Sequence, residues 1–175
     1  MGRHVNHKSN THMTNAADHT DISQMSLDER FSIASKTDTA KELLSRLAED
    51  EDYLVRMAVA KNPCAPETAL RHLAEDEYLF VRCSVAQNPA TPEDVLMLLA
   101  QEPEVDFEDV RAAVALNESA PLPLLELLAQ DESSVVRGAL THNPCASEGV
   151  LRRACLNAWR KIRSPMCVKQ PIRCS

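Results

Sequence analysis

The stretch NPCAPETALRHLAEDEYLFVRCSVAQNP, residues 62–89, begins and ends with the same dipeptide and decides the fold of this chain. Asn-Pro recurs at Asn62, Asn88 and Asn143, and Asn117-Glu118 is a degenerate copy, so successive asparagines are 26, 29 and 26 residues apart. A leucine follows each asparagine by eight residues, at Leu70, Leu96, Leu125 and Leu151. This period is typical of stacked, repeated supersecondary units.

Each unit predicts two short helices. In the first helix, Leu70, Leu73 and Ala74 fall at i, i+3 and i+4 and form one apolar stripe. The second helix runs through Val81-Arg82 to Val85-Ala86, and the proline of Asn88-Pro89 ends it. Because one such pair cannot bury its own stripe, several copies must stack.

Recurring residues also predict where the first helices begin. Pro66, Pro92 and Pro121 share one repeat position, which we assign to the first helical turn, where proline loses no hydrogen bond. Thr39 and Thr91 precede first helices, with Glu42 and Asp94 three residues on, and are predicted N-caps. Ser147 stands where the proline stood in the last copy.

These observations give an all-α solenoid of about four to five two-helix repeats of ~26 residues. Residues 1–25 are polar and without periodicity, and are expected to be a disordered N-terminal arm. Residues 26–38 form an N-terminal capping helix, opened by the capping box Ser26 to Glu29. The repeats occupy residues 39–157, and residues 158–175 form a basic C-terminal tail.

The repeated pattern Asn-Pro, Pro, Leu-x-x-Leu-Ala-x-Asp, Val-Arg, Val-Ala, Asn resembles the leucine-rich repeat variant family, over about residues 39–155. The resemblance implies HEAT-like helical units, slightly shorter than 26 residues, in a right-handed superhelix. In that family the second element can be a 3₁₀ turn. Some members carry an iron–sulfur cluster in an N-terminal cysteine module, but this chain has no cysteine before Cys64, so we expect no cofactor.

Charge is segregated along the 175 residues. Residues 1–38 sum to −1, residues 39–151 to −13 and residues 152–175 to +7. The acidic repeats repel nucleic acid, so nucleic acid could be attracted only through the tail residues Arg152, Arg153, Arg160, Lys161, Arg163, Lys169 and Arg173. The longest apolar runs, such as residues 95–100, are too short to cross a bilayer, and we expect a cytoplasmic location.

Two sets of residues recur once per unit and are candidate functional residues. The arginine ladder (Arg56, Arg82, Arg111 and Arg137) would line one edge of the superhelix and could bind carboxylate or phosphate. Alternatively, each arginine pairs with the acid at the end of the preceding helix (Asp50, Asp76, Glu102 and Asp131) and ties the units together. The asparagine ladder (Asn62, Asn88, Asn117 and Asn143) is expected to bond backbone groups between helices.

An insertion of three residues in the third unit supplies the remaining candidates. It lies in an acidic loop whose Glu104, Asp106, Phe107 and Glu108 could dock a basic partner or could simply be solvated. Insertions in solenoids fall in loops on one face, often the binding face.

No catalytic or zinc-binding motif is present, and the cysteines mostly occupy repeat positions. Cys155 replaces a core alanine and is expected to be buried. We therefore predict a non-enzymatic protein-interaction module or scaffold without a small-molecule substrate. The alternatives are a nucleic-acid- or membrane-associated protein acting through the basic tail, and a metal or iron–sulfur redox accessory protein using Cys167 and Cys174.

Overall fold

The computed structural model describes residues 21–101 and 108–162, with side chains described as far as residue 157. This part of the chain is helical and contains no strand. The helices in chain order are η1 (Ile22–Gln24), α1 (Leu27–Ser35), α2 (Lys41–Leu47), α3 (Tyr53–Lys61), α4 (Glu67–Leu73), α5 (Leu79–Gln87), α6 (Glu93–Ala100), α7 (Glu108–Leu116), α8 (Leu122–Leu128), α9 (Ser134–Ala139), η3 (Leu140–His142) and α10 (Glu148–Ile162). The all-helical repeat fold is thus confirmed, while the right-handed sense remains a prediction.

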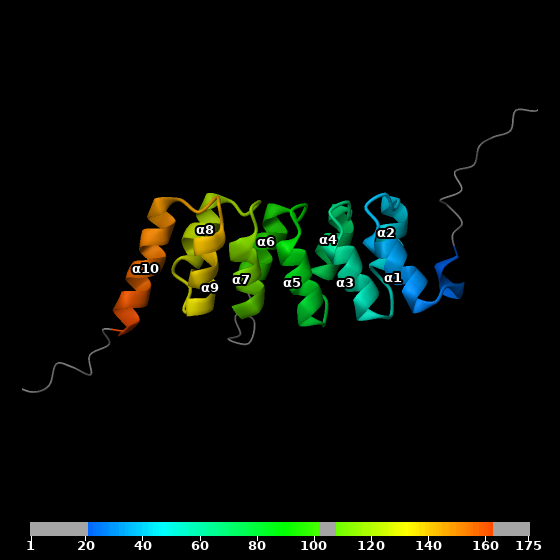
Figure 1. Ribbon diagram of the computed structural model, residues 1–175, viewed down its shortest axis with the longest axis horizontal. Helices are drawn as coiled ribbons and strands as arrows, with labels where there is room; N and C mark the ends of the chain where they lie inside the picture. Colours follow the sequence, from blue (N-terminus) through cyan, green and yellow to red (C-terminus); the bar gives the residue numbers. More distant parts are fainter. Residues whose placement is uncertain (1–20, 102–107, 163–175) are drawn as a thin grey trace, which may run out of the picture.

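Helix pairs follow one another along a single axis, and the two ends of the stack lie far apart (Figure 1). The second helices α3, α5, α7 and α9, preceded by α1, pack side by side in one row. The first helices α2, α4, α6 and α8 form the other row, and α10 packs on α8 and α9 as the last member. Neighbours approach more closely in the first of these rows, which we call the inner row, than in the second, the outer row.

The two rows share one aliphatic core. The leucine stripe of each first helix is fully buried, as in Leu70 and Leu73, and meets valines of the second helices such as Val55, Val81 and Val85. Alanines at adjacent inner-row positions are also buried, which allows the close spacing of that row. Burial of one such leucine stabilises the fold by roughly 3 kcal/mol relative to alanine.

Helix starts differ from the sequence prediction at each predicted position except Ser26. The capping box of Ser26 and Glu29 is confirmed, and the Ser147 hydroxyl accepts a hydrogen bond from the Val150 backbone N–H. Pro66, Pro92 and Pro121 are N-cap residues with extended backbone, one position before the first helical turn. The ring fixes φ but leaves ψ free, so proline fits this position as well.

The prediction that Thr39 and Thr91 cap helices was wrong. The Thr91 hydroxyl is buried and donates to the Val85 carbonyl at 2.6 Å, and Thr39 donates in the same way to Ile33 at 2.6 Å. Each hydroxyl thus satisfies a carbonyl at the C-terminal end of the preceding inner-row helix.

Both ends of the stack depart from the predicted boundaries. Residues 22–24 of the predicted disordered arm form the 3₁₀ turn η1, and residues 1–20 lie outside the described part. Helix α10 continues past residue 157 to Ile162, into the predicted tail. Cys155, predicted to be buried, is exposed; α10 is the last helix of the described residues and packs on α8 and α9.

Candidate interaction surface

The asparagine ladder closes the C-terminal ends of the inner-row helices. The Asn88 side chain is buried, and its Nδ2 donates to the carbonyls of Ala60 at 2.7 Å and Asn62 at 2.8 Å. Its Oδ1 accepts from the Ala90 backbone N–H at 2.8 Å. The same three contacts recur at Asn62, Asn117 and Asn143, so the predicted inter-helix role of the ladder is confirmed.

The arginine ladder lies at the opposite edge, where the chain passes from the outer to the inner row. Arg56 Nη1 donates to the backbone carbonyls of Asp50 and Glu51, at 2.8 and 3.1 Å. Its Nε and Nη2 donate to the two carboxylate oxygens of Asp76, at 2.6 and 3.1 Å. Arg111 makes the equivalent fork to Asp131, 20 residues on.

The predicted pairing of Arg56 with Asp50 was therefore wrong in direction, and Glu102, the predicted partner of Arg111, lies outside the described residues. The preceding turn supplies backbone carbonyls to Arg56, Arg82 and Arg137, and the following unit supplies the carboxylate for Arg56 and Arg111. The Asp50 carboxylate is bonded instead to Arg30 and to the Asp52 backbone N–H. The conclusion that the ladder ties units together holds for Arg56 and Arg111.

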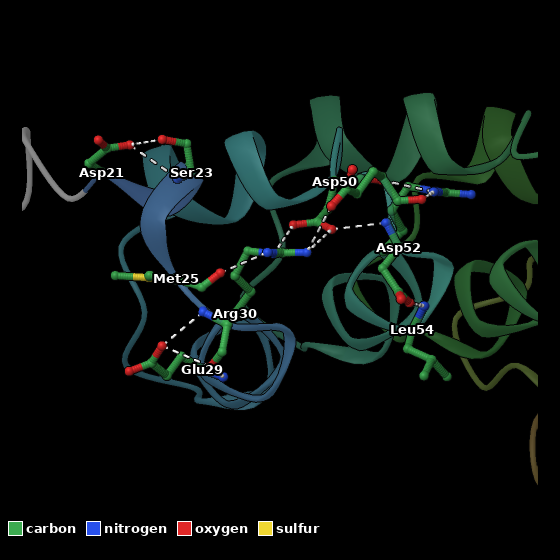
Figure 2. A network of polar contacts seen from close by, with 11 residues as sticks. Asp21, Ser23, Met25, Glu29, Arg30, Asp50, Asp52 and Leu54 are labelled. Carbon is green, nitrogen blue, oxygen red and sulfur yellow. Dashed lines mark hydrogen bonds and ion pairs between the residues drawn. The ribbon is translucent and has the colours of Figure 1, made fainter.

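Arg30, which the sequence analysis did not include, belongs to the same ladder (Figure 2). Arg30 lies in α1, and its guanidinium donates a hydrogen bond to the Met25 carbonyl at 2.9 Å. Its Nε lies 2.8 Å from the Asp50 carboxylate, which also accepts from the Asp52 backbone N–H at 2.9 Å. The signal was present in the period, since Arg30 stands 26 residues before Arg56.

Burial strengthens these ion pairs. Asp76 has 6% and Arg56 11% of its side chain exposed, so each charge depends on the other for solvation. The hydrogen bond to Asp76 raises the pKa of Arg56 above its ordinary value. Burial alone would raise the pKa of Asp76, but hydrogen bonds from Arg56 and from the Tyr78 backbone N–H outweigh it, and that pKa is lowered.

The residues predicted to form the binding surface are mostly buried or lie outside the described part of the chain. The ladder arginines Arg82, Arg111 and Arg137 are buried and Arg56 is half-buried, which leaves little guanidinium surface for a partner. Glu104, Asp106 and Phe107 of the acidic loop lie outside the described residues. Glu108 begins α7 and accepts a hydrogen bond from the Ser133 hydroxyl.

The solvent-facing side of the inner row carries apolar side chains that the sequence analysis did not single out. They occupy equivalent repeat positions: Leu54, Phe80 and Val135 at i, Phe31, Met57 and Cys83 at i+3, and Leu116 at i+7. In α7, Asp109 stands at i and the buried Ala112 at i+3, so the row is interrupted there. Phe80 is 66% exposed, and the others are exposed or half-buried. We call this set the apolar lane: Phe31, Leu54, Met57, Phe80, Cys83, Leu116 and Val135.

Shallow hollows lie along the lane between neighbouring inner-row helices. One is lined by Phe31, Met57 and Pro63, between α1 and α3. A second, two units further, is lined by Pro89 and Leu116, between α5 and α7. The lane is therefore a ridged surface with a hollow between ridges, which suits insertion of side chains from a partner.

Exposed carboxylates border the lane on the side of the arginine ladder. Glu51 is 89% and Glu77 79% exposed, next to the ion-paired Asp50 and Asp76. The stacked rings of Tyr53 and Tyr78, with centroids 4.7 Å apart, stand at the same edge. We call the exposed carboxylates of these turns the acidic margin: Glu49, Glu51, Glu75, Glu77 and Glu132.

The solvent-facing side of the outer row differs in chemistry. Ion pairs connect neighbouring first helices, between Arg71 and Asp94 and between Arg153 and Glu126. Exposed leucines interrupt these pairs at Leu98, Leu122 and Leu127. The solvent-facing surface of the outer row therefore mixes charged and apolar side chains, unlike the lane.

The basic tail and the cysteine pair are mostly outside the described residues. Arg152 is exposed and pairs with Glu148 on α10 at 2.7 Å. The side chains of Arg160 and Lys161, together with Arg163, Cys167 and Cys174, are not described. Among the residues that are, no three metal-ligating side chains lie together, and no helix is long and apolar enough to span a membrane.

Comparison with known proteins agrees with the repeat. Residues 108–133, which contain α7 and α8, match the model of the leucine rich repeat variant family. The resemblance drawn from the sequence is thereby confirmed for this unit. No curated protein and no solved structure matches the chain.

Proposed function

We propose that this helical-repeat chain is a non-enzymatic protein-interaction module that binds its partner on the apolar lane. The main support for this proposal is the exposure of Phe80, whose side chain is 66% exposed in a row of apolar side chains that no element of the described chain covers. Contiguous exposed apolar surface bordered by polar groups is typical of protein-binding faces.

The division of labour within each unit supports this proposal. The asparagine and arginine side chains that recur in every unit are buried and hold the stack together. The lane positions differ from unit to unit, from Phe31 through Met57 and Cys83; Met57 and Cys83 are half-buried and pack partly against the core. Variable side chains on a constant scaffold are how repeat proteins distinguish partners.

A cytoplasmic location is part of the proposal. Within the described residues, Cys64, Cys83, Cys145 and Cys155 form no disulfide, as is usual for proteins of a reducing compartment.

Affinity capture from a native lysate with matched variants tests the proposal. Met57→Glu with Phe80→Glu places two charges in the lane, and Leu98→Glu with Leu127→Glu places two on the outer row. We expect a protein retained by the wild-type chain to be retained by the outer-row variant and lost with the lane variant. A partner lost equally with both variants, or with neither, would contradict the proposal.

A further inference from the structure

The spacing of the apolar lane limits the shape of what can bind there. Packed helices lie about 8–10 Å apart, so the lane presents its ridges at roughly that interval. An α-helix lying along the row advances about 10.5 Å in seven residues, and an extended chain advances about 10 Å in three. Both shapes can place one anchor in each hollow, so spacing alone does not choose between them.

The hydrogen-bonding needs of the partner's backbone favour a helix over an extended segment. The lane offers the apolar side chains of Phe31, Met57, Phe80 and Cys83, and the nearby asparagine amides are already bonded within the stack. An extended segment would bury its backbone N–H and C=O groups against this surface without partners. A helix satisfies those groups internally and places only side chains in the hollows.

The negative charge on one edge of the lane favours one orientation of the bound helix. The acidic margin borders the lane along the arginine-ladder edge, where Glu51 and Glu77 are 89% and 79% exposed and lie 3.5 Å from Arg30 and 3.9 Å from Arg56. The opposite edge, at the Asn-Pro turns, carries the mixed side chains Lys61, Gln87 and His142. A complementary helix therefore needs positive charge along one flank only.

We propose that the lane binds an amphipathic α-helix of a partner protein, with apolar anchors repeating about every seven residues and lysine or arginine on the flank facing the acidic margin. This inference rests on the proposed function and specifies the partner's chemistry. The apolar anchors supply most of the affinity, and the basic flank sets the orientation and the rate of encounter.

Four labelled synthetic peptides of 21 residues test the inference against the full chain by fluorescence anisotropy. One is amphipathic with a lysine flank, one has the same composition in scrambled order, one carries glutamate on the flank, and one carries proline at two central positions. We expect the lysine amphipathic peptide to bind at least tenfold more tightly than each of the others. Equal binding of the scrambled, acidic or proline-containing peptide would overturn the inference.

Matched charge variants locate the flank. Glu51→Gln with Glu77→Gln is expected to weaken the lysine peptide about tenfold and to reduce its salt dependence. Glu42→Gln with Glu93→Gln makes the same change of net charge on exposed outer-row positions and is expected to alter affinity less than twofold. Equal effects of the two pairs would show binding by net charge alone and would overturn the inference.

Lane variants separate this inference from the proposed function. Met57→Ser with Phe80→Ser is expected to weaken the lysine peptide at least 30-fold, since about 2 kcal/mol of apolar contact is lost. Circular dichroism checks that the variant remains folded, as the exposure of Phe80 predicts. If a captured partner depends on the lane but is displaced only by the acidic peptide, the proposed function stands and the basic-helix inference fails.

Discussion

Replacement of Asn88 by alanine tests whether the asparagine ladder stabilises the stack. Asn88 is 2% exposed, and its side chain makes two donated bonds and one accepted bond, at 2.7, 2.8 and 2.8 Å. Both donated bonds cross to the preceding unit. The change therefore removes a link between units as well as contacts within one turn.

The expected cost follows from these contacts. Each intramolecular hydrogen bond contributes about 1 kcal/mol net, and a buried polar group left without a partner costs about 1–3 kcal/mol. The loss of three hydrogen bonds, together with an Ala60 carbonyl left without the Asn88 donor, should lower the free energy of unfolding by about 3–5 kcal/mol. That is a large part of the roughly 5–15 kcal/mol that stabilises a typical domain.

The assay is equilibrium urea unfolding followed by circular dichroism, with Gln87→Ala as the control on an exposed neighbour at the same helix end. Asn88→Asp keeps the acceptor but points a carboxylate at two carbonyls, which raises its folded-state pKa. The difference in free energy of unfolding between Asn88→Asp and wild type should therefore decrease as the pH falls. An Asn88→Ala cost below about 1 kcal/mol, or equal costs at positions 87 and 88, would refute the reasoning.

Four further changes follow from the same contacts. Arg56→Gln leaves Asp76 buried without its partner and should cost about 3–5 kcal/mol in urea unfolding, while Arg56→Met with Asp76→Leu should recover most of it. Because the folded-state pKa of Asp76 lies below 3.8, its stabilisation is present above that pH and is lost as the pH falls through the folded value. The free-energy gap between wild type and Arg56→Gln should accordingly narrow as the pH falls below 3.8; a constant gap would argue against the pair. Thr91→Val should cost about 1–2 kcal/mol by losing the bond to Val85, and Thr91→Ser should be milder, whereas a capping role would predict disturbance of α6 by hydrogen exchange. Phe80→Ser should change stability by less than about 0.5 kcal/mol in thermal unfolding, and Leu70→Ala should cost roughly 3 kcal/mol.

The helix pairs and the asparagine ladder could be predicted from the sequence because each depends on local, repeated requirements. Leu70 and Leu73 must share a stripe, and Asn88 before a proline must leave the helix with its side chain turned inward. These requirements recur at one period, so agreement among copies compensates for the weakness of each single signal.

The partners of the arginines and threonines could not be predicted, because the sequence offers two candidates for each. An acid stands both 6 residues before and 20 residues after Arg56, and only the stacking of units brings Asp76 rather than Asp50 to the guanidinium edge. Thr91 can cap α6 or bond Val85, and tertiary packing decides. The lane could not be predicted, because its positions carry different residues from unit to unit, such as Phe80 and Asp109, and so give no repeated signal.

The asparagine bonds between described units reach back 28 and 26 residues at Asn62, Asn88 and Asn143, and 31 and 29 residues at Asn117, which follows the insertion. Asn88 reaches back to Ala60 and Asn62, and Arg56 reaches forward to Asp76. Deleting the 26 residues from Asn62 to Gln87 would place Asn88-Pro89 behind Lys61, where Asn62-Pro63 stood. Genetic change can therefore lengthen or shorten the molecule by whole units without creating a new interface, and the 29-residue unit that ends at Asn117 keeps its ladder bonds despite three extra residues.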